Sequence, residues 1–168
     1  NAYVWGLDLS GSPQGAGGIG GLLRAVPATG PPRYYAFDAN GNVSDLVGDD
    51  GSILGHYEYD PYGNIASQSG DFADDNPFRF STKYTDDETG MLYYGHRYYP
   101  PRMGSWPSRD PLREPGFSSP AVQDDADDED SSPSGRRDGG GNLYCFVGND
   151  AVQIIDILGL RWKVDRKG

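Results

Sequence analysis

The sequence predicts an all-β fold, and three observations lead to that prediction. Its 168 residues include 25 Gly, 13 Pro and 12 Tyr, which is typical of short strands joined by tight turns. Long periodic runs of helix-forming residues are absent from the sequence. An aromatic-Asp-x-x-Gly-Asn-aliphatic unit also occurs twice, starting at Phe37 and again at Tyr59, about 22 residues further on. A short repeat of this kind indicates stacked β-hairpins.

The first expected element is a strand at residues 3–10, followed by a glycine-rich loop at residues 11–23. The loop matches the Gly-x-Gly-x-x-Gly fingerprint of dinucleotide-binding proteins at Gly15, Gly17 and Gly20. That fingerprint needs a helix at its last glycine, and Pro27 leaves room for only about two helical turns. Asp38, which lies where a ribose-binding acid would be sought, already belongs to the first repeat. We therefore favour a tightly turned or flexible loop over a nucleotide-dependent enzyme.

Residues 34–67 hold the two repeat units. In each unit an alternating aromatic run predicts a strand and Asp-x-x-Gly-Asn predicts a tight turn, because Asp and Asn bond their own backbone and Gly adopts positive φ. Asp38 and Asp60 begin these turns. Between the units, residues 49–52 predict a further turn before a strand that starts at Ile53. A hairpin of this size cannot bury its own aromatic face, so we expect the hairpins to stack on neighbours.

After the repeats, the sequence predicts further aromatic strands. The expected strands are residues 78–80, 91–94 after a turn at 85–90, and 93–99. Pro100 and Pro101 end the last of these because proline cannot donate to a β-ladder. Two apolar segments, residues 142–149 and 152–160, complete the pattern.

The net charge of −11 argues against nucleic acid as a ligand, since phosphate contacts need clustered Lys and Arg. Part of this charge lies in a Ser-, Pro- and Asp-rich stretch at about residues 115–138, which we interpret as a disordered insert. Its acids lack the glycine-punctuated spacing of a calcium loop, and His56 and His96 are isolated, so we predict no metal and no other cofactor. The lone Cys145 excludes an internal disulfide. No apolar run is long enough for membrane insertion.

Several longer motifs resemble one family. They are N-P-F-R-F-S-T-K-Y at residues 76–84, T-G-M-L-Y-Y-G-H-R-Y-Y at 89–99, G-S-W at 104–106, S-R-D-P at 108–111, N-L-Y at 142–144 and D-I-L-G-L at 156–160. Together with the repeats, they are similar to the RHS (YD) repeat-associated core domain of bacterial polymorphic toxins, insecticidal toxin-complex C subunits and type VI secretion effectors. The resemblance covers most of the chain from about Tyr34 to Leu160.

The resemblance implies a β-hairpin ribbon that spirals into a hollow shell and ends in a core domain, which closes the shell as a plug. The implied units are an N-terminal strand and loop at 1–33, repeat hairpins at 34–75, the core domain at 76–160 and the start of a variable C-terminal region at 161–168. The implied partners are the rest of the shell, an enclosed C-terminal toxin and secretion machinery, in a bacterial protein that is secreted or delivered to the cell surface. Because Asn1 replaces an initiator Met, we expect a fragment of a longer polypeptide.

In many members of that family the core domain is an aspartyl autoprotease that cuts after a terminal Gly-Leu. The resemblance therefore implies cleavage between Leu160 and Arg161, with Asp110 and Asp156 as the two matching aspartates. Two carboxylates held close together cannot both ionise, so such a pair can act as a base toward water and as an acid toward the peptide nitrogen.

Arg109 would bias the protonation of the pair or hold its strand by a charge-assisted bond, and Asp138 is an outside candidate. The chain departs from the family pattern at Arg113, where the family has glycine, and at residues 156–159, where the motif lacks proline. Asp-Pro and Asp-x-x-Gly are also ordinary turn sequences. In the alternative interpretation the aspartates only cap turns, and the chain is a purely structural or adhesive repeat module without proteolysis.

Overall fold

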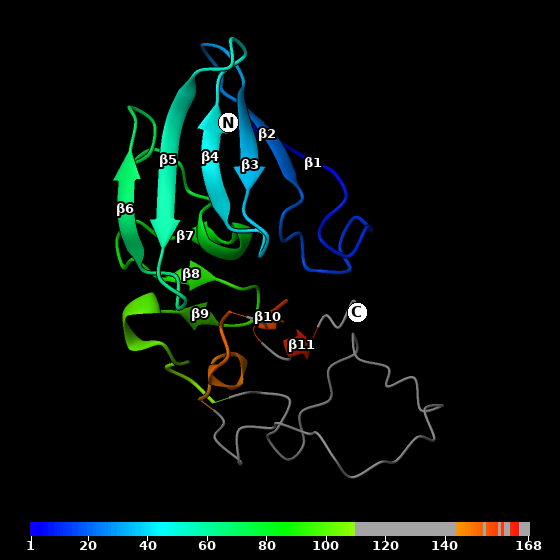
Figure 1. The fold of residues 1–168 in the computed structure, drawn as a ribbon, viewed down its shortest axis with the longest axis vertical. Coiled ribbons are helices and arrows are strands. Elements are labelled where there is room, and N and C mark those ends of the chain that lie inside the picture. The colour runs from blue at the N-terminus through cyan, green and yellow to red at the C-terminus, as the bar shows by residue number, and fades with distance from the viewer. Residues whose placement is uncertain (110–143, 153, 158, 160–161, 165–168) are drawn as a thin grey trace.

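The computed structural model describes residues 1–109, 144–152, 154–157, 159 and 162–164. In this part of the chain the regular elements are β-strands and short 3-10 turns, with no α-helix, which confirms the all-β prediction. Figure 1 shows a large N-terminal sheet with the smaller C-terminal elements gathered at one end of it. No helix among the described residues is long and apolar enough to cross a membrane.

The N-terminal part is a six-stranded antiparallel meander in which each strand pairs with the next one in sequence. Its strands are β1 (Ala2–Trp5), β2 (Leu22–Val26), β3 (Arg33–Phe37), β4 (Val43–Val47), β5 (Ile53–Tyr59) and β6 (Ile65–Ser69). The strand predicted at residues 3–10 is shorter than expected, because Asp8 accepts a hydrogen bond from the Ser10 amide and turns the chain into the glycine-rich loop. The β5 start at Ile53 agrees with the sequence.

Both repeat units make the same turn, as predicted. Asp38 Oδ1 accepts hydrogen bonds from the amides of Asn40 and Asn42 at 2.9 Å, and Asp38 Oδ2 accepts one from the Asn42 side chain at 2.7 Å. The second turn, which begins at Asp60, repeats all three contacts at the same distances. Gly41 has a φ of 74°, a left-handed conformation that favours glycine. The Asp and Gly positions of the repeat are therefore both requirements of the turn.

A small core lies on one face of the repeat strands. It consists of the buried residues Val43, Leu46, Tyr57 and Ala73, with partly buried Tyr35, Phe37, Leu54, Tyr59 and Phe72 around them. The Tyr57 hydroxyl donates a 2.7 Å hydrogen bond to the Ala73 carbonyl, so the ring is anchored at its polar end. The predicted aromatic face thus packs on the segment that follows β6.

The C-terminal part is built from short strands and turns. A three-stranded antiparallel sheet contains β7 (Tyr84–Thr85), β8 (Leu92–Tyr93) and β9 (Tyr98–Tyr99), and β10 (Ile154–Asp156) pairs with β11 (Trp162–Val164). The 3-10 turns are η1 (Phe80–Thr82), η2 (Pro101–Met103) and η4 (Val147–Asn149). The predicted turn at residues 85–90 and the predicted stop after Tyr99 are both confirmed.

Two strands predicted in this region are wrong. At residues 78–80 only Phe78 forms a β-bridge, and the chain then turns through Ser81, whose φ is 51° and whose amide bonds Asn42 Oδ1 at 2.7 Å. Residues 93–99 are a hairpin and not one strand, because Gly95 at φ 98° reverses the chain. In both cases contact with distant residues or a single glycine outweighs a continuous aromatic pattern.

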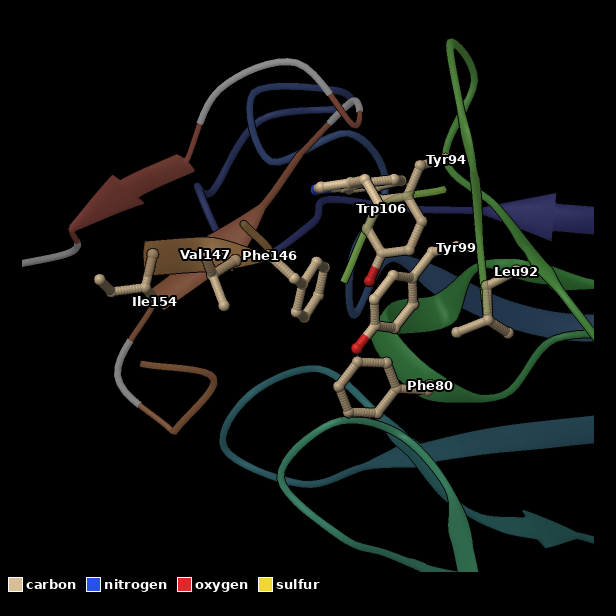
Figure 2. Packing of buried hydrophobic residues seen from close by; sticks show 8 residues of the cluster. All are labelled: Phe80, Leu92, Tyr94, Tyr99, Trp106, Phe146, Val147 and Ile154. Atoms are coloured by element: carbon tan, nitrogen blue, oxygen red, sulfur yellow. The ribbon is translucent and has the colours of Figure 1, made fainter. Parts of the chain in front are cut away.

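A cluster of aromatic side chains fills the C-terminal part. Its buried members are Phe80, Leu92, Tyr94, Tyr99, Trp106, Phe146, Val147 and Ile154. Figure 2 shows Phe146 against the ring of Tyr99, where the two rings stack with centroids 4.0 Å apart, and Trp106 beside Tyr94. Because Phe146, Val147 and Ile154 come from the far side of the acidic segment, this cluster joins the end of the described chain to residues 80–106.

Several predicted features lie outside the described residues. They are Asp110, Arg113, Asp138, the acidic stretch at 115–138, Leu160 and Arg161. Cys145 is described, is half-buried and forms an isolated β-bridge with Ser105 in place of the predicted strand.

Candidate functional site

Four charged side chains are buried where the glycine-rich loop, the β7–β9 sheet and the end of β10 come together. Asp8, Lys83, Arg97 and Asp156 are only 6%, 7%, 5% and 3% exposed, respectively. Burying a charge is costly unless the group is paired and hydrogen-bonded, so such a cluster requires specific partners. Lys83, Arg97 and Asp156 each form a hydrogen bond with Ile157 or Gly159, just before the predicted cleavage position.

Asp156, at the end of β10, closes a turn with its own side chain. Its Oδ1 accepts a 2.7 Å hydrogen bond from the amide of Gly159. Its Oδ2 lies 3.8 Å from Nη2 of Arg97, which provides an opposite charge in a buried environment. This arrangement differs from the repeat turns, where the Gly amide bonds the backbone carbonyl of the Asp.

Arg97 holds the other side of the same turn. It lies between β8 and β9, and its Nε donates to the carbonyl oxygen of Gly159. The guanidinium also lies 3.9 Å from the centroid of the Trp106 ring, a cation–π contact. Gly159 therefore has its amide bonded by Asp156 and its carbonyl bonded by Arg97.

Position 159 also requires glycine. Its φ is 72°, and an added Cβ would lie 3.0 Å from Tyr94 Cβ and 3.1 Å from the Trp106 ring. Both the backbone conformation and the packing therefore oppose a side chain here. The residue before Leu160 is thus fixed in conformation, in hydrogen bonding and in its surroundings.

Lys83 ties the turn to the N-terminal loop. Its Nζ donates hydrogen bonds to the carbonyl oxygens of Ile157 at 2.7 Å and of Gly17 at 3.0 Å, and it lies 5.2 Å from the Tyr94 ring centroid. Burial lowers the pKa of Lys83 to about 8, although the nearby charges of Asp156 and Asp8 act in the opposite direction. The ammonium group thus bridges segments from the two ends of the chain.

The glycine-rich loop folds around Asp8. Asp8 Oδ2 accepts hydrogen bonds from the amides of Ala16 at 2.7 Å and Gly18 at 3.1 Å. Burial of Asp8 raises its pKa, but the hydrogen bonds from Ser10, Ala16 and Gly18 outweigh burial, so the pKa is lowered. The loop runs directly into β2 without a helix. A carboxylate of the chain itself occupies these loop amides, which gives the nucleotide-binding interpretation no geometric support.

Among the predicted catalytic residues, the described structure places two. Asp156 is buried in the cluster, whereas Arg109 is exposed and its Nε donates to the Tyr144 hydroxyl at 3.2 Å. Asp110, Asp138, Leu160 and Arg161 lie outside the described residues. Their proposed roles therefore stay predictions.

The sequence reasoning missed Arg97 and Lys83. Both lie inside aromatic segments that predict strands, and a basic residue there is usually on the solvent side. The only available signal was a Lys and an Arg inside the family-like motifs at residues 76–84 and 89–99. Burial of these groups could not be recognised without the tertiary contacts.

The two histidines have different surroundings. His56 Nδ1 lies 2.7 Å from Asp45 Oδ1, and this hydrogen bond raises the pKa of His56. His96 is exposed in the hairpin turn. Among the described residues, no group of three or more His, Cys, Asp or Glu side chains is arranged to hold a metal ion.

Comparison with known proteins finds similar segments in a nuclease and in toxins. No protein-family model matches the chain. It is 31% identical over 140 residues to the tRNA3(Ser)-specific nuclease WapA of Bacillus spizizenii, covering 83% of this chain and 5% of that protein. It is 40% identical over 82 residues to toxin subunit YenC1 of Yersinia entomophaga, covering 47% of this chain and 8% of that protein.

One solved structure contains a segment whose fold is similar to that of this chain. The Photorhabdus luminescens Tc holotoxin pore with a TccC3 variant matches with a TM-score of 0.59 at 28% identity, covering 84% of this chain and 6% of that one. This chain is therefore similar to short segments of a bacterial nuclease and of bacterial toxin proteins, one of which is part of a larger toxin assembly. It spans less than a tenth of the length of each.

Proposed function

We propose that this chain is the closing part of an RHS-repeat shell. In this proposal residues 1–33 and the repeat hairpins at 34–75 belong to the wall, residues 76–160 form the core domain that plugs it, and residues 161–168 begin the enclosed cargo. The support is the order of the family-like motifs, together with similarity to a segment of a Tc holotoxin at a TM-score of 0.59.

Contacts between the repeats and the core support a wall that is continuous with its plug. The Asn42 side chain accepts a hydrogen bond from the Ser81 amide at 2.7 Å, and the Asn64 side chain donates one to the Pro101 carbonyl at 3.3 Å. Each of these asparagines also donates to the aspartate of its own turn. The repeat motif thus closes a turn and fastens it to the next unit.

The outer strands of the large sheet are an observation in favour of further partners. β1 and β6 are its outer strands, and all five residues of β6 are exposed. Open strand edges are usually covered in native proteins. We assign the rest of the protein's own shell to these edges and a C-terminal toxin to the interior, in a secreted or surface-delivered bacterial protein that uses secretion machinery.

Electron microscopy of the full-length protein tests the shell. A hollow particle closed at one end supports the proposal, and a solid or extended particle contradicts it.

Self-cleavage after Leu160 is the second half of the proposed function. The observation that carries it is the Asp156 carboxylate, which is 3% exposed and bonded to the amide of Gly159, one residue before Leu160. A second carboxylate beside it would keep one proton on the pair, as in aspartic proteases.

In the proposed reaction, Asp110 supplies that second carboxylate. The ionised member of the pair takes a proton from water, and the water oxygen bonds to the carbonyl carbon of Leu160. The protonated member gives its proton to the nitrogen of Arg161, and the bond between Leu160 and Arg161 breaks. Arg109 biases the protonation of the pair, and Asp138 is the substitute if Asp110 is not the partner.

The purely structural or adhesive module has an observation in its favour as well. Both oxygens of Asp156 already have partners, Gly159 and Arg97, which hold the turn. A carboxylate with this role alone would stabilise the plug without cutting it. Specific binding of the chain to a glycan array would support the adhesive form of this alternative.

The intact mass of the purified chain distinguishes self-cleavage from the purely structural or adhesive module. Cleavage predicts a fragment that ends at Leu160 and a second that starts at Arg161, and Asp110→Asn or Asp156→Asn should leave the chain whole. Asp75→Asn is the matched control because Asp75 is an exposed aspartate outside the site. A chain that stays whole under all conditions contradicts the protease. Cutting that survives Asp110→Asn contradicts the assignment of that residue.

A further inference from the structure

The glycine-rich loop and Lys83 contact the segment before the predicted cleavage position from one side. Lys83 Nζ bonds the carbonyl oxygens of Gly17 and Ile157 at the same time, although these residues lie 66 and 74 positions away from it. Because Lys83 is 7% exposed, water competes little for these bonds. The Ile157 carbonyl is therefore held next to the Gly17 carbonyl.

Gly17 lets the loop approach Ile157 closely. A Cβ on Gly17 would lie 2.5 Å from the Ile157 oxygen and 2.6 Å from Ile157 Cγ2. Real Cβ atoms essentially never approach another heavy atom so closely, so any side chain at Gly17 must displace Ile157 or the loop. Gly11 has a similar positive φ, 74° against 62°, but a Cβ there would have nothing within 4 Å. The chain thus contains a matched pair of glycines that differ in their contact with Ile157.

The loop itself is fixed to the repeat sheet. Asp8 bonds its amides at Ala16 and Gly18, and the Gly20 amide donates to Thr82 Oγ1 at 2.8 Å. The Thr82 hydroxyl in turn donates to the carbonyl of Gly41, in the first repeat turn, at 2.7 Å. Thr82, the residue before Lys83, therefore ties the loop to the first repeat turn.

We propose that Gly17 and Lys83 form a seat that holds Ile157 and Gly159 in position beside Asp156, and that the proposed cleavage after Leu160 depends on this seat. Gly17 and Lys83 act through the substrate backbone, so both are positioning residues. The second half of this inference rests on the proposed cleavage, whereas the first half concerns only how the segment is held.

Hydrogen exchange of the full 168-residue chain, followed by mass spectrometry, tests the seat without cleavage. Its reporter is the peptide that contains the Gly159 amide. Gly17→Ala should speed exchange in this peptide at least about tenfold, because displacement of Ile157 loosens the turn. Gly11→Ala carries the same positive-φ strain and should leave exchange there unchanged. Equal exchange in the two variants overturns the proposal.

Cleavage rates test the second half of the inference, that the proposed cleavage depends on the seat. Misplacing a reacting group by about 1 Å can cost on the order of 100-fold in rate, so Gly17→Ala should be cut that much more slowly than Gly11→Ala. Gly17→Ala should also lose more stability in urea than Gly11→Ala, because only its Cβ meets Ile157. Equal cleavage rates in the two variants would mean that the contact with Ile157 does not affect cleavage, and that result overturns the positioning role.

Lys83→Met provides a variant without a backbone clash. It removes both hydrogen bonds and keeps an unbranched apolar stem, so faster exchange at Gly159 is expected even if Gly17→Ala does not fold. Unchanged exchange in Lys83→Met contradicts the seat. A wild-type chain that is never cut contradicts the proposed cleavage, and the exchange data still decide whether the seat exists.

Discussion

The repeat turns and the C-terminal part of the described chain, which we propose as the plug, use polar side chains in opposite ways. In the turns, Asp38 and Asp60 bond residues two and four positions further on. In the plug, Lys83 bonds Ile157 across 74 positions, and Arg97 bonds Gly159 across 62. The first kind of contact forms within one hairpin, whereas the second requires the whole fold.

This difference has an energetic consequence. Local bonds at a half-exposed turn compete with water, so the loss of one turn affects mainly that hairpin. Buried charges that join distant segments leave an unsatisfied partner in an apolar environment when one is removed. We therefore expect substitutions in the plug to be more damaging than substitutions in the repeats, in the following order.

The largest effect is expected for Trp106→Ala. Trp106 is 1% exposed, contacts Tyr94, Tyr99 and Phe146, and supports the guanidinium of Arg97. Its truncation should lower the free energy of unfolding by about 3–5 kcal/mol in urea titrations. Tyr93→Ala is the control, because Tyr93 is 44% exposed. Similar losses for the two variants would show that the cluster does not hold the plug.

Arg97→Met should follow, with a loss of about 3 kcal/mol, because it removes the positive charge 3.8 Å from the buried Asp156. The double variant Arg97→Met/Asp156→Leu should recover part of that loss, since it removes the second charge as well. Urea titrations of the two single variants and the double variant measure the coupling. Additive losses would contradict a direct interaction between the two side chains.

Smaller and equal effects are expected at the repeats. Asp38→Ala and Asp60→Ala each remove the same set of three hydrogen bonds and should cost about 1–2 kcal/mol each. Because the two turns do not share these bonds, the double variant should lose the sum. A loss at either position as large as that of Arg97→Met would remove the distinction between repeats and plug.

The smallest effect concerns pH. The pKa of Lys83 is lowered from 10.5 to about 8, so between these values the unfolded chain binds one more proton at this site than the folded chain does. The contribution of Lys83 to the free energy of unfolding therefore rises with pH, by at most about 1.4 kcal/mol from pH 8 to 9. Below pH 8 Lys83 is protonated in both the folded and the unfolded chain, so it adds no further pH dependence to the stability. Lys83→Met should abolish the difference, which urea titrations at pH 8 and 9 can measure.

The predictable parts of the molecule are those with local causes. Asp38 with Gly41, the turn at residues 85–90 and the strand stop at Pro100 each require particular residue types within a few positions, and the structure has all three. The hairpin at Gly95 escaped prediction because aromatic residues continue on both sides of it. Residues 78–80 look like a strand but turn because the distant Asn42 bonds the Ser81 amide.

The candidate site was predictable only in part. Asp156 was singled out from its family-like motif, and the structure places it buried beside Gly159, while its catalytic role stays a prediction. Arg97 and Lys83 were missed because nothing within their own segments shows that both side chains are buried. The glycine-rich loop resembled a nucleotide site, but its spacing serves close contact with Asp8 and Ile157.

By itself, the sequence determined the all-β class and the repeated turns, because short-range hydrogen bonding and backbone conformation depend on neighbouring residues. Only the tertiary structure decided which charges are buried and which segments they join. Those contacts connect Gly17, Lys83 and Ile157, and their burial depends on the packing of the aromatic cluster, which no local pattern encodes.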